Sequence, residues 1–397
     1  METQAVTTDV PALARLQRWG LVVGFWGLVA GAVGGVFQPD QFFRSWLIGF
    51  LFCLGLSLGS LALLMLQHMS GGQWGLVGRR IWEAGTRTLP YVTLLFVPLL
   101  FGLPRLFKWA QPELARTDTI IQMKAPYLNV PFFLGRALLY FAVWLVGSWL
   151  LNKWSAAQDR GEVAVTAEDT ARFRVVSAPG LLIYVILMTF ASVDWVMSLD
   201  PHWYSTIFGL IVVVGQGLSA LALAIVMLSL LRRTEPYATY LNPGHFLDLG
   251  KLLLAFVMLW TYFSFSQFLI IWAGNLPEEI PFFYNRAQHG WKFVSFVILF
   301  GHFVVPFTLL LSRNLKKHPH LLANVALAVI AMRLLDLIWL VEPMFERGGF
   351  PIHWMDLALP LGLAGLWFFV FVRQLRSRPL MPLNDPYFKE AFAHDVH

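Results

Sequence analysis

Three ionisable residues, Asp194, Asp200 and His202, lie close together in the segment ASVDWVMSLDPHWYSTIFG, where an apolar stretch of the chain ends. A carboxylate inside a membrane span costs about 2.5–3.5 kcal/mol at the bilayer centre, so it usually pairs with a cation or faces a polar cavity. Asp194 falls within the apolar stretch, and we interpret it as a candidate proton relay. Asp200 precedes Pro201, a pattern typical of a helix N-cap, and we expect it to begin a short helix at the membrane surface. His202 lies near solvent and can exchange protons near neutral pH.

The same pattern occurs a second time further along the chain. The segment LLDLIWLVEP repeats the pattern of SVDWVMSLDP, so that Asp336 corresponds to Asp194 and Glu342 to Asp200. For Glu342, which also precedes a proline, we expect the same capping role. Two other pairs of segments match in the same order: FFLGRALLYF with ILFGHFVVPF, and GLSLGSLALL with GLSALALAIV. Together these matches indicate an internal duplication.

Further ionisable residues within apolar segments could form a route for protons. Arg333 and Asp336 are three residues apart and share a helical face, so we predict a local ion pair, which could also be a purely structural bridge. His302 lies at mid-depth and could carry protons in either direction, or be held by hydrogen bonds alone. The hypothetical route runs from the outer to the inner side through Asp194, Asp336, Arg333, His302, Lys251 and His68, with Arg136 tuning the neighbouring carboxylates.

The composition indicates which elements must hold these residues. The 397-residue chain is 57% hydrophobic and only 13% charged, which favours a polytopic membrane protein over a soluble one. About ten apolar runs are long enough to cross a bilayer as helices. They cover residues 20–37, 43–67, 89–107, 131–151, 178–198, 205–231, 249–273, 293–312, 320–342 and 354–374. The third run is the least regular, because Pro90, Pro98 and Pro104 interrupt it.

The duplication predicts how these helices are arranged. We expect an all-α fold of two parallel-repeat four-helix bundles, helices 2–5 and 6–9, related by an axis along the membrane normal, with helices 1 and 10 peripheral. Helix 1 carries Gly20-x3-Gly24 and Gly27-x3-Gly31-x3-Gly35, a seam for close packing within the fold or against another subunit. The expected divisions are residues 1–42 (N-terminus and helix 1), 43–204 (first bundle), 205–345 (second bundle) and 346–397 (helix 10 and tail).

The distribution of basic residues predicts the orientation of the chain. The loops on one side hold 18 of the lysines and arginines and those on the other side hold 8, the remaining 3 falling inside helices. By the positive-inside rule the first side is cytoplasmic, so that both termini are cytoplasmic. The sequence pI of about 9.5 reflects this bias rather than nucleic-acid binding.

Several kinds of redox and hydrolytic site are excluded. The single cysteine, Cys53, rules out disulfides, cysteine-ligated iron–sulfur clusters and a CxxCH haem site. Only His302 lies deep, so a haem held between two histidines is not expected, and no Walker A, GxSxG or HExxH motif occurs. We therefore expect no metal site and no catalytic residue in this chain. Electron chemistry would come from a diffusible quinone or from partner proteins.

Two segments suggest a family. The stretch Ala191–Gly209 and the stretch FSQFLIIWAGNLPEE, Phe265–Glu279, resemble the second NrfD-type (polysulfide-reductase-like, ActF-type) membrane subunit of bacterial alternative complex III, a quinol:electron-carrier oxidoreductase. The resemblance covers essentially the whole chain. The one departure from the family pattern is at Trp272-Ala273-Gly274, where an aromatic residue would be expected after the tryptophan.

The resemblance implies an assembly in the bacterial inner membrane. The expected partners are a sister NrfD-like subunit, ActC, a periplasmic iron–sulfur subunit and multihaem c-type cytochromes, which would carry the haem c and the clusters. In the family the quinol-oxidising site is usually assigned to ActC, so this chain is expected to be a scaffold and proton-conducting subunit that could also contact quinone. The outer-side functional or interface residues that the resemblance implies are Asp200, His202, Gln267, Asn275, Glu278 and Glu279.

Two other functions are compatible with the sequence. A secondary transporter also uses repeated bundles and buried charges, although no paired, unwound half-helices are evident. A pure assembly subunit would carry the same charges as structural pairs.

Overall fold

The computed structural model describes residues 10–160, 167–345 and 352–392, and within these ranges the chain forms helices and turns but no strand. Ten helical segments are long and apolar enough to cross a membrane, which confirms the prediction of an all-α polytopic membrane protein. The spanning helices are α1 (Pro11–Phe37), α2 (Pro39–Ser70), α3 with α4 (Gln73–Thr86 and Leu89–Phe101), α8 (Val130–Asp159), α9 (Ala167–Trp195), α10 (Phe208–Leu231), α12 (Pro243–Gly274), α14 with η3 and α15 (Trp291–Ile298, Leu299–Val304 and Val305–Leu311), α17 (Pro319–Val341) and α18 (Met355–Arg376).

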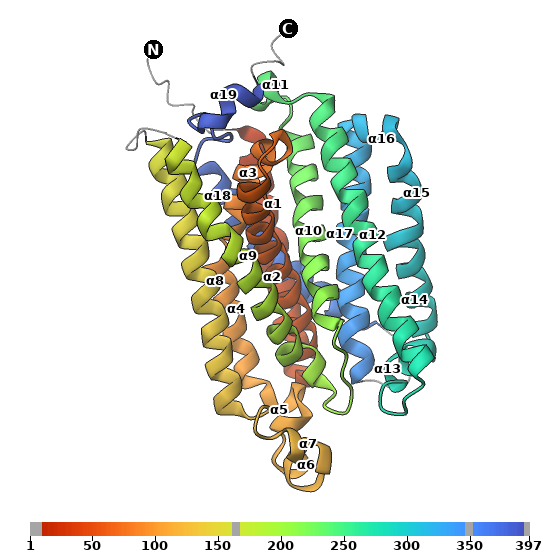
Figure 1. Cartoon of the computed structure of the whole chain (residues 1–397). Coiled ribbons are helices and arrows are strands. Elements are labelled where there is room, and N and C mark those ends of the chain that lie inside the picture. Colours follow the sequence, from red (N-terminus) through yellow and green to blue (C-terminus); the bar gives the residue numbers. More distant parts are fainter. Residues whose placement is uncertain (1–9, 161–166, 346–351, 393–397) are drawn as a thin grey trace.

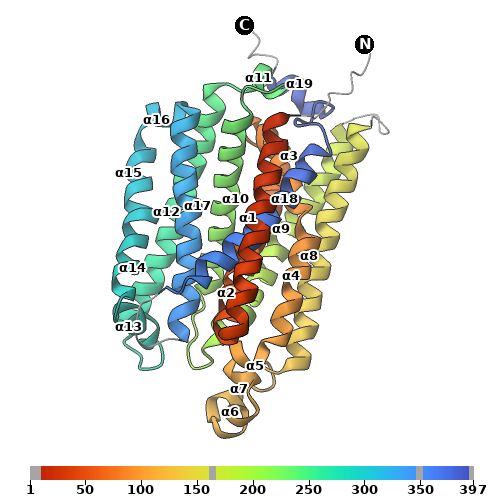
Figure 2. The ribbon, with the colours of Figure 1, turned by 180° about the vertical axis from the view of Figure 1, so that it is seen from behind.

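Short elements connect the spans. They are α5 (Leu103–Leu106), η1 (Lys108–Ala110), α6 (Pro112–Thr117), α7 (Thr119–Lys124), η2 (Met197–Leu199), α11 (Tyr237–Tyr240), α13 (Pro281–Ala287), α16 (Arg313–Lys317), η4 (Glu342–Met344) and α19 (Pro386–Phe392). Figure 1 shows α11, α16 and α19 at one end of the molecule, which we call the tail end. It shows α5, α6, α7 and α13 at the opposite end, which we call the protrusion end. The start of α1 and the C-terminal α19 both lie at the tail end (Figure 2), as an even number of spans requires.

Helices α2 and α10 form the centre of the molecule. Both are apolar on most sides, and other helices bury nearly all of their length. They pack directly against each other. The close approach depends on Gly59, because a Cβ there would lie 2.0 Å from the carbonyl oxygen of Gln216. These are also the two helices that the duplicated GLS segments predict to be equivalent.

The remaining helices form a group beside each of these central helices. Helices α3, α4, α8 and α9 lie on the side of α2, and helices α12, α14, α15 and α17 lie on the side of α10 (Figure 1). This grouping is the one expected of two four-helix bundles. The division expected near residues 204 and 205 falls between η2 and α10.

Helix α1 lies on the outside of the bundle, against α18 (Figure 2), and α18 in turn packs against α2. The glycine seam of α1 faces glycines of α18: a Cβ on Gly27 would lie 2.5 Å from the Cα of Gly362, and one on Gly365 would lie 2.6 Å from the backbone N of Gly24. The seam therefore serves the fold of this chain. The opposite face of α1 is apolar and exposed, with Trp26 at 63% exposure.

The third span differs from its prediction. It begins at Gln73 rather than near residue 89, because α3 enters the bundle instead of forming a loop. The 18 basic residues assigned to loops on one side include Arg79 and Arg80, and for these two the assignment was wrong. Both are buried in α3, where each pairs with Glu83, and Asp385 and Asp159 supply the further negative charge. A single helix can carry this many charges into the protein interior only when oppositely charged residues pair with them. Hydropathy averaged along the sequence does not detect such pairs.

Candidate functional site: buried charges inside the helical bundle

Asp194 is fully buried and forms a bidentate ion pair with Arg136. The guanidinium Nε donates to Oδ2 at 2.9 Å and Nη2 donates to Oδ1 at 2.7 Å, so that α8 is joined to α9 near the protrusion end. The hydroxyl of Tyr140 donates a third hydrogen bond to Oδ2 at 2.8 Å. Planar pairs of this kind combine charge with fixed geometry. The carboxylate is thus held by three donors.

Aromatic rings complete the surroundings of Arg136. Its guanidinium lies 3.8 Å from the ring centroid of Tyr127 and 4.3 Å from that of Phe132, and Nη1 donates to the carbonyl of Tyr127. Burial, and then the negative charge of Asp194, raise the pKa of Tyr127 to about 12. The arrangement holds both charges in place. We conclude that it makes Asp194 a better structural counter-ion than proton carrier.

Arg333 and Asp336 form the ion pair predicted from their spacing, with Nη1 donating to Oδ2. Both side chains are buried within α17. Gly215 of α10 provides the space for the arginine, because a Cβ there would lie 2.5 Å from its Cζ. The pair therefore lies where the second group of helices meets the centre of the molecule.

A small cavity adjoins Arg333 and has room for about one water molecule. It lies between α2, α10, α17 and the end of α9, and its polar lining comes from Gln216, Ser219 and Arg333. Gln216 accepts a hydrogen bond from the hydroxyl of Tyr184 at 2.7 Å. The cavity thus adjoins two polar groups, the α17 ion pair and the Tyr184–Gln216 pair.

His302 is fully buried, and neither ring nitrogen has a hydrogen-bond partner within the described residues. Its ring stacks on Trp260 with 4.1 Å between centroids and 8° between planes. It lies in the π-helical turn η3, just before Pro306. Because Pro306 has no N–H to donate to the carbonyl of His302 and its ring crowds that carbonyl, the regular helical pattern cannot continue there.

The two copies of the repeat have diverged at this site. In the first copy the cation of the pair is Arg136, on the helix that faces Asp194. In the second copy His302 occupies the equivalent position, and the cation comes from the same helix as Asp336, at position 333. The duplication therefore preserves a neutralised aspartate but not the residue that neutralises it.

A second buried cluster joins two carboxylates at the protrusion end. The side-chain amide of Gln41 donates to Asp356 at 2.7 Å and to Glu342 at 3.2 Å, and Ser45 donates to Asp356 at 2.6 Å. Arg44 approaches Glu342 at 4.0 Å. The capping role expected for Glu342 was wrong, because its side chain accepts from Gln41 rather than from the amides of a following helix.

The sequence reading missed Gln41, Ser45 and Asp356. One local signal was available: Gln41 and Ser45 are four residues apart at the start of α2, and so present two polar groups on one face of an apolar helix. Their acidic partners, however, lie some three hundred residues further along the chain, and no local pattern indicates them.

The protrusion end also holds Asp200 and His202. The His202 ring lies between two carboxylates, with Nε2 2.9 Å from Asp118 and Nδ1 3.5 Å from Asp200. Lys108 lies 3.5 Å from Asp200. The expected N-cap at Asp200 was wrong, because Pro201 lies in a turn and no helix begins there. These charges instead fasten the segment containing η1 and α7 to the loop that follows α9.

Asp118 itself caps α7, accepting hydrogen bonds from the N–H groups of Ile120 and Ile121. Burial alone would raise the pKa of this carboxyl, but the Ile121 hydrogen bond and the neighbouring His202 lower it below its ordinary value. The carboxylate is therefore favoured in its charged form.

The other expected outer-side residues lie at or beyond the end of α12. Gln267 is buried and accepts a hydrogen bond from Ser205 at 3.1 Å, which ties α12 to the loop after α9. Asn275 ends α12 in the left-handed conformation, a position that favours asparagine. Asn275 and Glu278 are exposed and Glu279 is partly exposed, so these residues are accessible for an interface.

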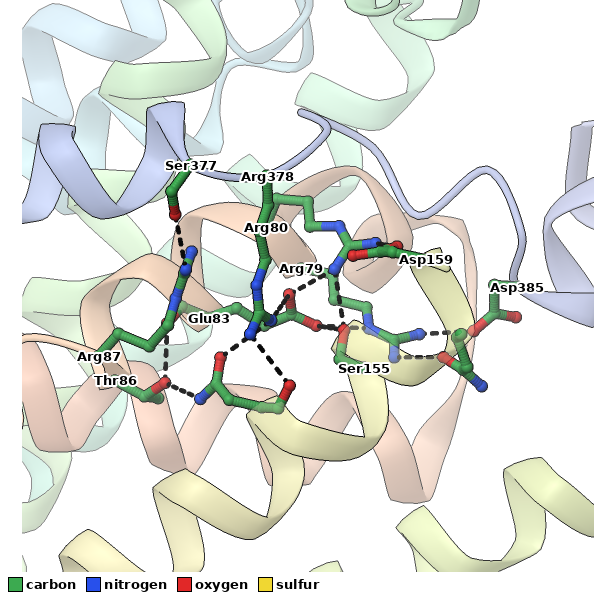
Figure 3. A network of polar contacts seen from close by, with 12 residues as sticks. Arg79, Arg80, Glu83, Thr86, Arg87, Ser155, Asp159, Ser377, Arg378 and Asp385 are labelled. Carbon is green, nitrogen blue, oxygen red and sulfur yellow. Dashed lines mark hydrogen bonds and ion pairs between the residues drawn. The ribbon is translucent and has the colours of Figure 1, made fainter. Parts of the chain in front are cut away.

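A network of charges occupies the tail end (Figure 3). Glu83 accepts from Arg79 at 3.0 Å and from Arg80 at 2.6 Å, and Arg80 also pairs with Asp159 of α8. Arg79 reaches Asp385 at 2.5 Å, so the network ties the C-terminal segment to α3. The spacing of Arg79, Arg80 and Glu83 is the ordinary helical spacing of an ion pair, and it could have indicated a buried helix from the sequence.

Two expected members of the proton route lie near the tail end. The Nδ1 of His68 lies 3.1 Å from the hydroxyl of Ser177 on α9, and Gln67, the preceding residue, packs on Gly75 of α3. Lys251 is different. Its side chain is 59% exposed on the outer face of α12 and pairs with Asp248 at 2.8 Å, so the structure does not bring it into the interior.

Helix α9 contributes to all three groups. Tyr184 and Ser177 lie on one face, separated by two helical turns, about 10 Å, and contact α10 and α2. Asp194 is ten residues after Tyr184, which turns it by about 80° from that face, and it pairs with α8. A single helix therefore takes part in the protrusion-end ion pair, the central Tyr184–Gln216 pair and the contact with the tail-end histidine.

Comparison with known proteins does not assign this site. No protein-family model matches the chain, and no curated protein matches it. Within the described residues no group of three or more histidine, cysteine, aspartate or glutamate side chains could hold a metal ion.

Proposed function

We propose that this chain is a non-catalytic membrane subunit of a quinol:electron-carrier oxidoreductase of the alternative complex III type, in which it acts as a scaffold and conducts protons. The observation that carries the proposal is the row of buried polar groups between the two ends of an otherwise apolar bundle. Such groups are costly in a membrane interior and commonly mark a path for ions or protons.

The path we propose begins at the Glu342–Asp356 cluster at the protrusion end. Asp336 lies six residues before Glu342, about 9 Å along the helix. From the Arg333–Asp336 pair the path crosses the cavity to the Tyr184–Gln216 pair. Its members on the tail side are His68 and Ser177, followed by the charges around Glu83. Water would complete the intervals between these groups, as in other hydrogen-bonded relays.

Asp194 and His302 take lesser parts in this proposal. Asp194 is saturated by Arg136 and Tyr140, so it would fix the electrostatic potential rather than carry protons. His302 stacks on Trp260, and within the described residues its nitrogens contact no hydrogen-bonding group. Lys251 is left out of the path, because it lies on the outer face.

A quinone headgroup does not fit the cavity beside Arg333, which has room for about one water molecule. We therefore route no redox step through this cavity and place quinol oxidation, haem c and iron–sulfur clusters in partner subunits. The orientation we propose has the tail end in the cytoplasm of a bacterial inner membrane, following the bias of basic residues. The protrusion end, with Asn275, Glu278 and Glu279, would then face the periplasmic partners.

One observation favours a second candidate, a purely structural subunit. In the Arg136–Asp194 pair and around Glu83, oppositely charged side chains pair directly with one another, as expected of charges that only join helices. A solute would not fit the cavity beside Arg333, so this cavity gives no support to a solute transporter.

The first experiment is purification through a tag on this chain in mild detergent, followed by mass spectrometry of the subunits and a haem spectrum. Co-purified haem and iron–sulfur subunits with quinol:acceptor activity are expected, and a lone haem-free chain would contradict the proposal. In the assembly, D336N should lower the number of protons moved per electron, whereas D248N, at an exposed ion pair, should not. Normal stoichiometry in a correctly assembled D336N complex would favour the structural subunit.

A further inference from the structure

The stem of Lys316 is buried, although the residue lies at an end of the helical bundle. Only 6% of the residue is exposed, and it makes no hydrogen bond or ion pair within the described part of the chain. A lysine of this kind packs its alkyl stem against neighbouring groups while its ammonium group reaches water. The stem is thus held in place, and the charge at its end is accessible to an anion from outside.

The fold provides a slot for this side chain. A Cβ on Gly250 would lie 2.7 Å from the Cγ of Lys316 and 2.9 Å from its Cδ, so the stem lies directly on the backbone of α12. Only glycine leaves room for that contact. Burial, and then the charge of the nearby Lys251, lower the pKa of Lys316. The surroundings therefore add positive charge next to the ammonium group.

The slot lies at the tail end, where α15 ends and α17 begins (Figure 1). Arg313 and Lys317 on the same short helix are exposed. The nearby carboxylate of Asp248 forms an ion pair with Lys251. The neighbouring helix ends present apolar side chains to the outside, with Leu311 at 58% and Leu321 at 41% exposure. Basic side chains thus border a surface that is apolar enough to contact acyl chains.

We propose that this slot binds the headgroup phosphate of an anionic phospholipid, with Lys316 as the principal contact and Lys251 and Arg313 around it. The charge is complementary, and the position at the edge of the apolar surface is where a lipid headgroup lies. The exposed leucines favour a lipid over a soluble anion, because they would otherwise contribute nothing to binding. The proposal does not depend on the respiratory function.

The test uses the full-length chain, stripped of lipid in detergent and titrated with phosphatidylglycerol or phosphatidylcholine while bound lipids are counted by native mass spectrometry. The wild-type chain should retain phosphatidylglycerol selectively. K316M should weaken that binding roughly fivefold, since one lysine near an anionic surface contributes about that factor. G250A keeps every charge but displaces the lysine stem, so it should weaken binding as well.

K317M provides the matched control, because Lys317 is adjacent in sequence and exposed. Equal losses for K316M and K317M would mean that general surface charge attracts the lipid, and would overturn the proposal. Unchanged binding in both K316M and G250A would also overturn it, as would displacement of the lipid by inorganic phosphate alone. Thermal unfolding in phosphatidylcholine nanodiscs shows whether each variant is folded. If one variant does not fold, the other still decides the outcome.

Discussion

The pair formed by Arg136 and Asp194 allows a quantitative test of how buried charges hold this bundle together. D194N removes one charge and leaves the arginine buried beside neutral groups. Breaking a buried ion pair by removing one partner costs about 3–5 kcal/mol. We expect a value near the lower limit, because the rings of Tyr127 and Phe132 would still stabilise the guanidinium by about 0.5–2 kcal/mol. R136M should cost more, because Asp194 would then be fully buried with only Tyr140 as a donor.

The double variant separates the pair from its parts. R136M/D194N removes both charges and should be less destabilised than the sum of the single variants, with a coupling of about 2–3 kcal/mol. The free energy of unfolding can be measured by titration with denaturing detergent, using helicity as the signal. D248N is the control, since an exposed pair contributes about 0–1 kcal/mol. A cost below about 1 kcal/mol for D194N, or no coupling, would refute the view that this pair joins α8 to α9. Reduced proton transfer with normal stability would refute the view that Asp194 is a fixed charge.

Three further results are expected. His302→Phe should change the free energy of unfolding by less than about 1.5 kcal/mol. The histidine ring stacks flat on Trp260, and its nitrogens have no hydrogen-bond partner within the described residues. A larger loss of stability in the detergent titration would contradict this account. Gly27→Leu should separate α1 from α18 and lower the unfolding temperature, whereas Gly147→Ala, which faces open space, should not; equal effects would contradict the packing argument. The pKa of Asp118 is held below its ordinary value, so its stabilising effect is present above the ordinary pKa and is lost as the pH falls through the lowered value. The protection of the Ile121 amide from hydrogen exchange, relative to its intrinsic exchange rate at each pH, should therefore fall below about pH 4, and constant protection would argue against the cap.

The sequence was sufficient for those features that depend on local spacing. Hydropathy over about twenty residues predicted the ten spans, and the three-residue interval between Arg333 and Asp336 predicted their ion pair. The glycine interval in helix 1 predicted a close helix contact but not its partner, because α18 lies more than three hundred residues away in the sequence. Close contacts between distant segments are decided by tertiary packing, which no local window contains.

The errors have a common physical cause. Asp-Pro and Glu-Pro resemble helix caps locally, so the sequence predicts caps at Asp200 and Glu342, yet both carboxylates contact side chains from other segments. The charges of α3 lower the local hydropathy, so the sequence predicts a loop there, yet Asp159 and Asp385 from distant segments pair with them. A carboxylate has several acceptor sites and is satisfied by whichever donors the fold brings near, so its role cannot be fixed by its immediate neighbours.

The divergence of the two repeats gives a reason to place the proposed path in the second half of the chain. An aspartate that faces an arginine on another helix, as in the first repeat, is held by two hydrogen bonds that also join the helices, so taking up a proton would loosen the fold. An aspartate paired within its own helix can change its protonation without separating two helices, and in the second repeat the adjoining cavity also leaves room for a water molecule. Duplication followed by relocation of the cation would therefore free one of two equivalent carboxylates for proton transfer while the other continued to hold the bundle together.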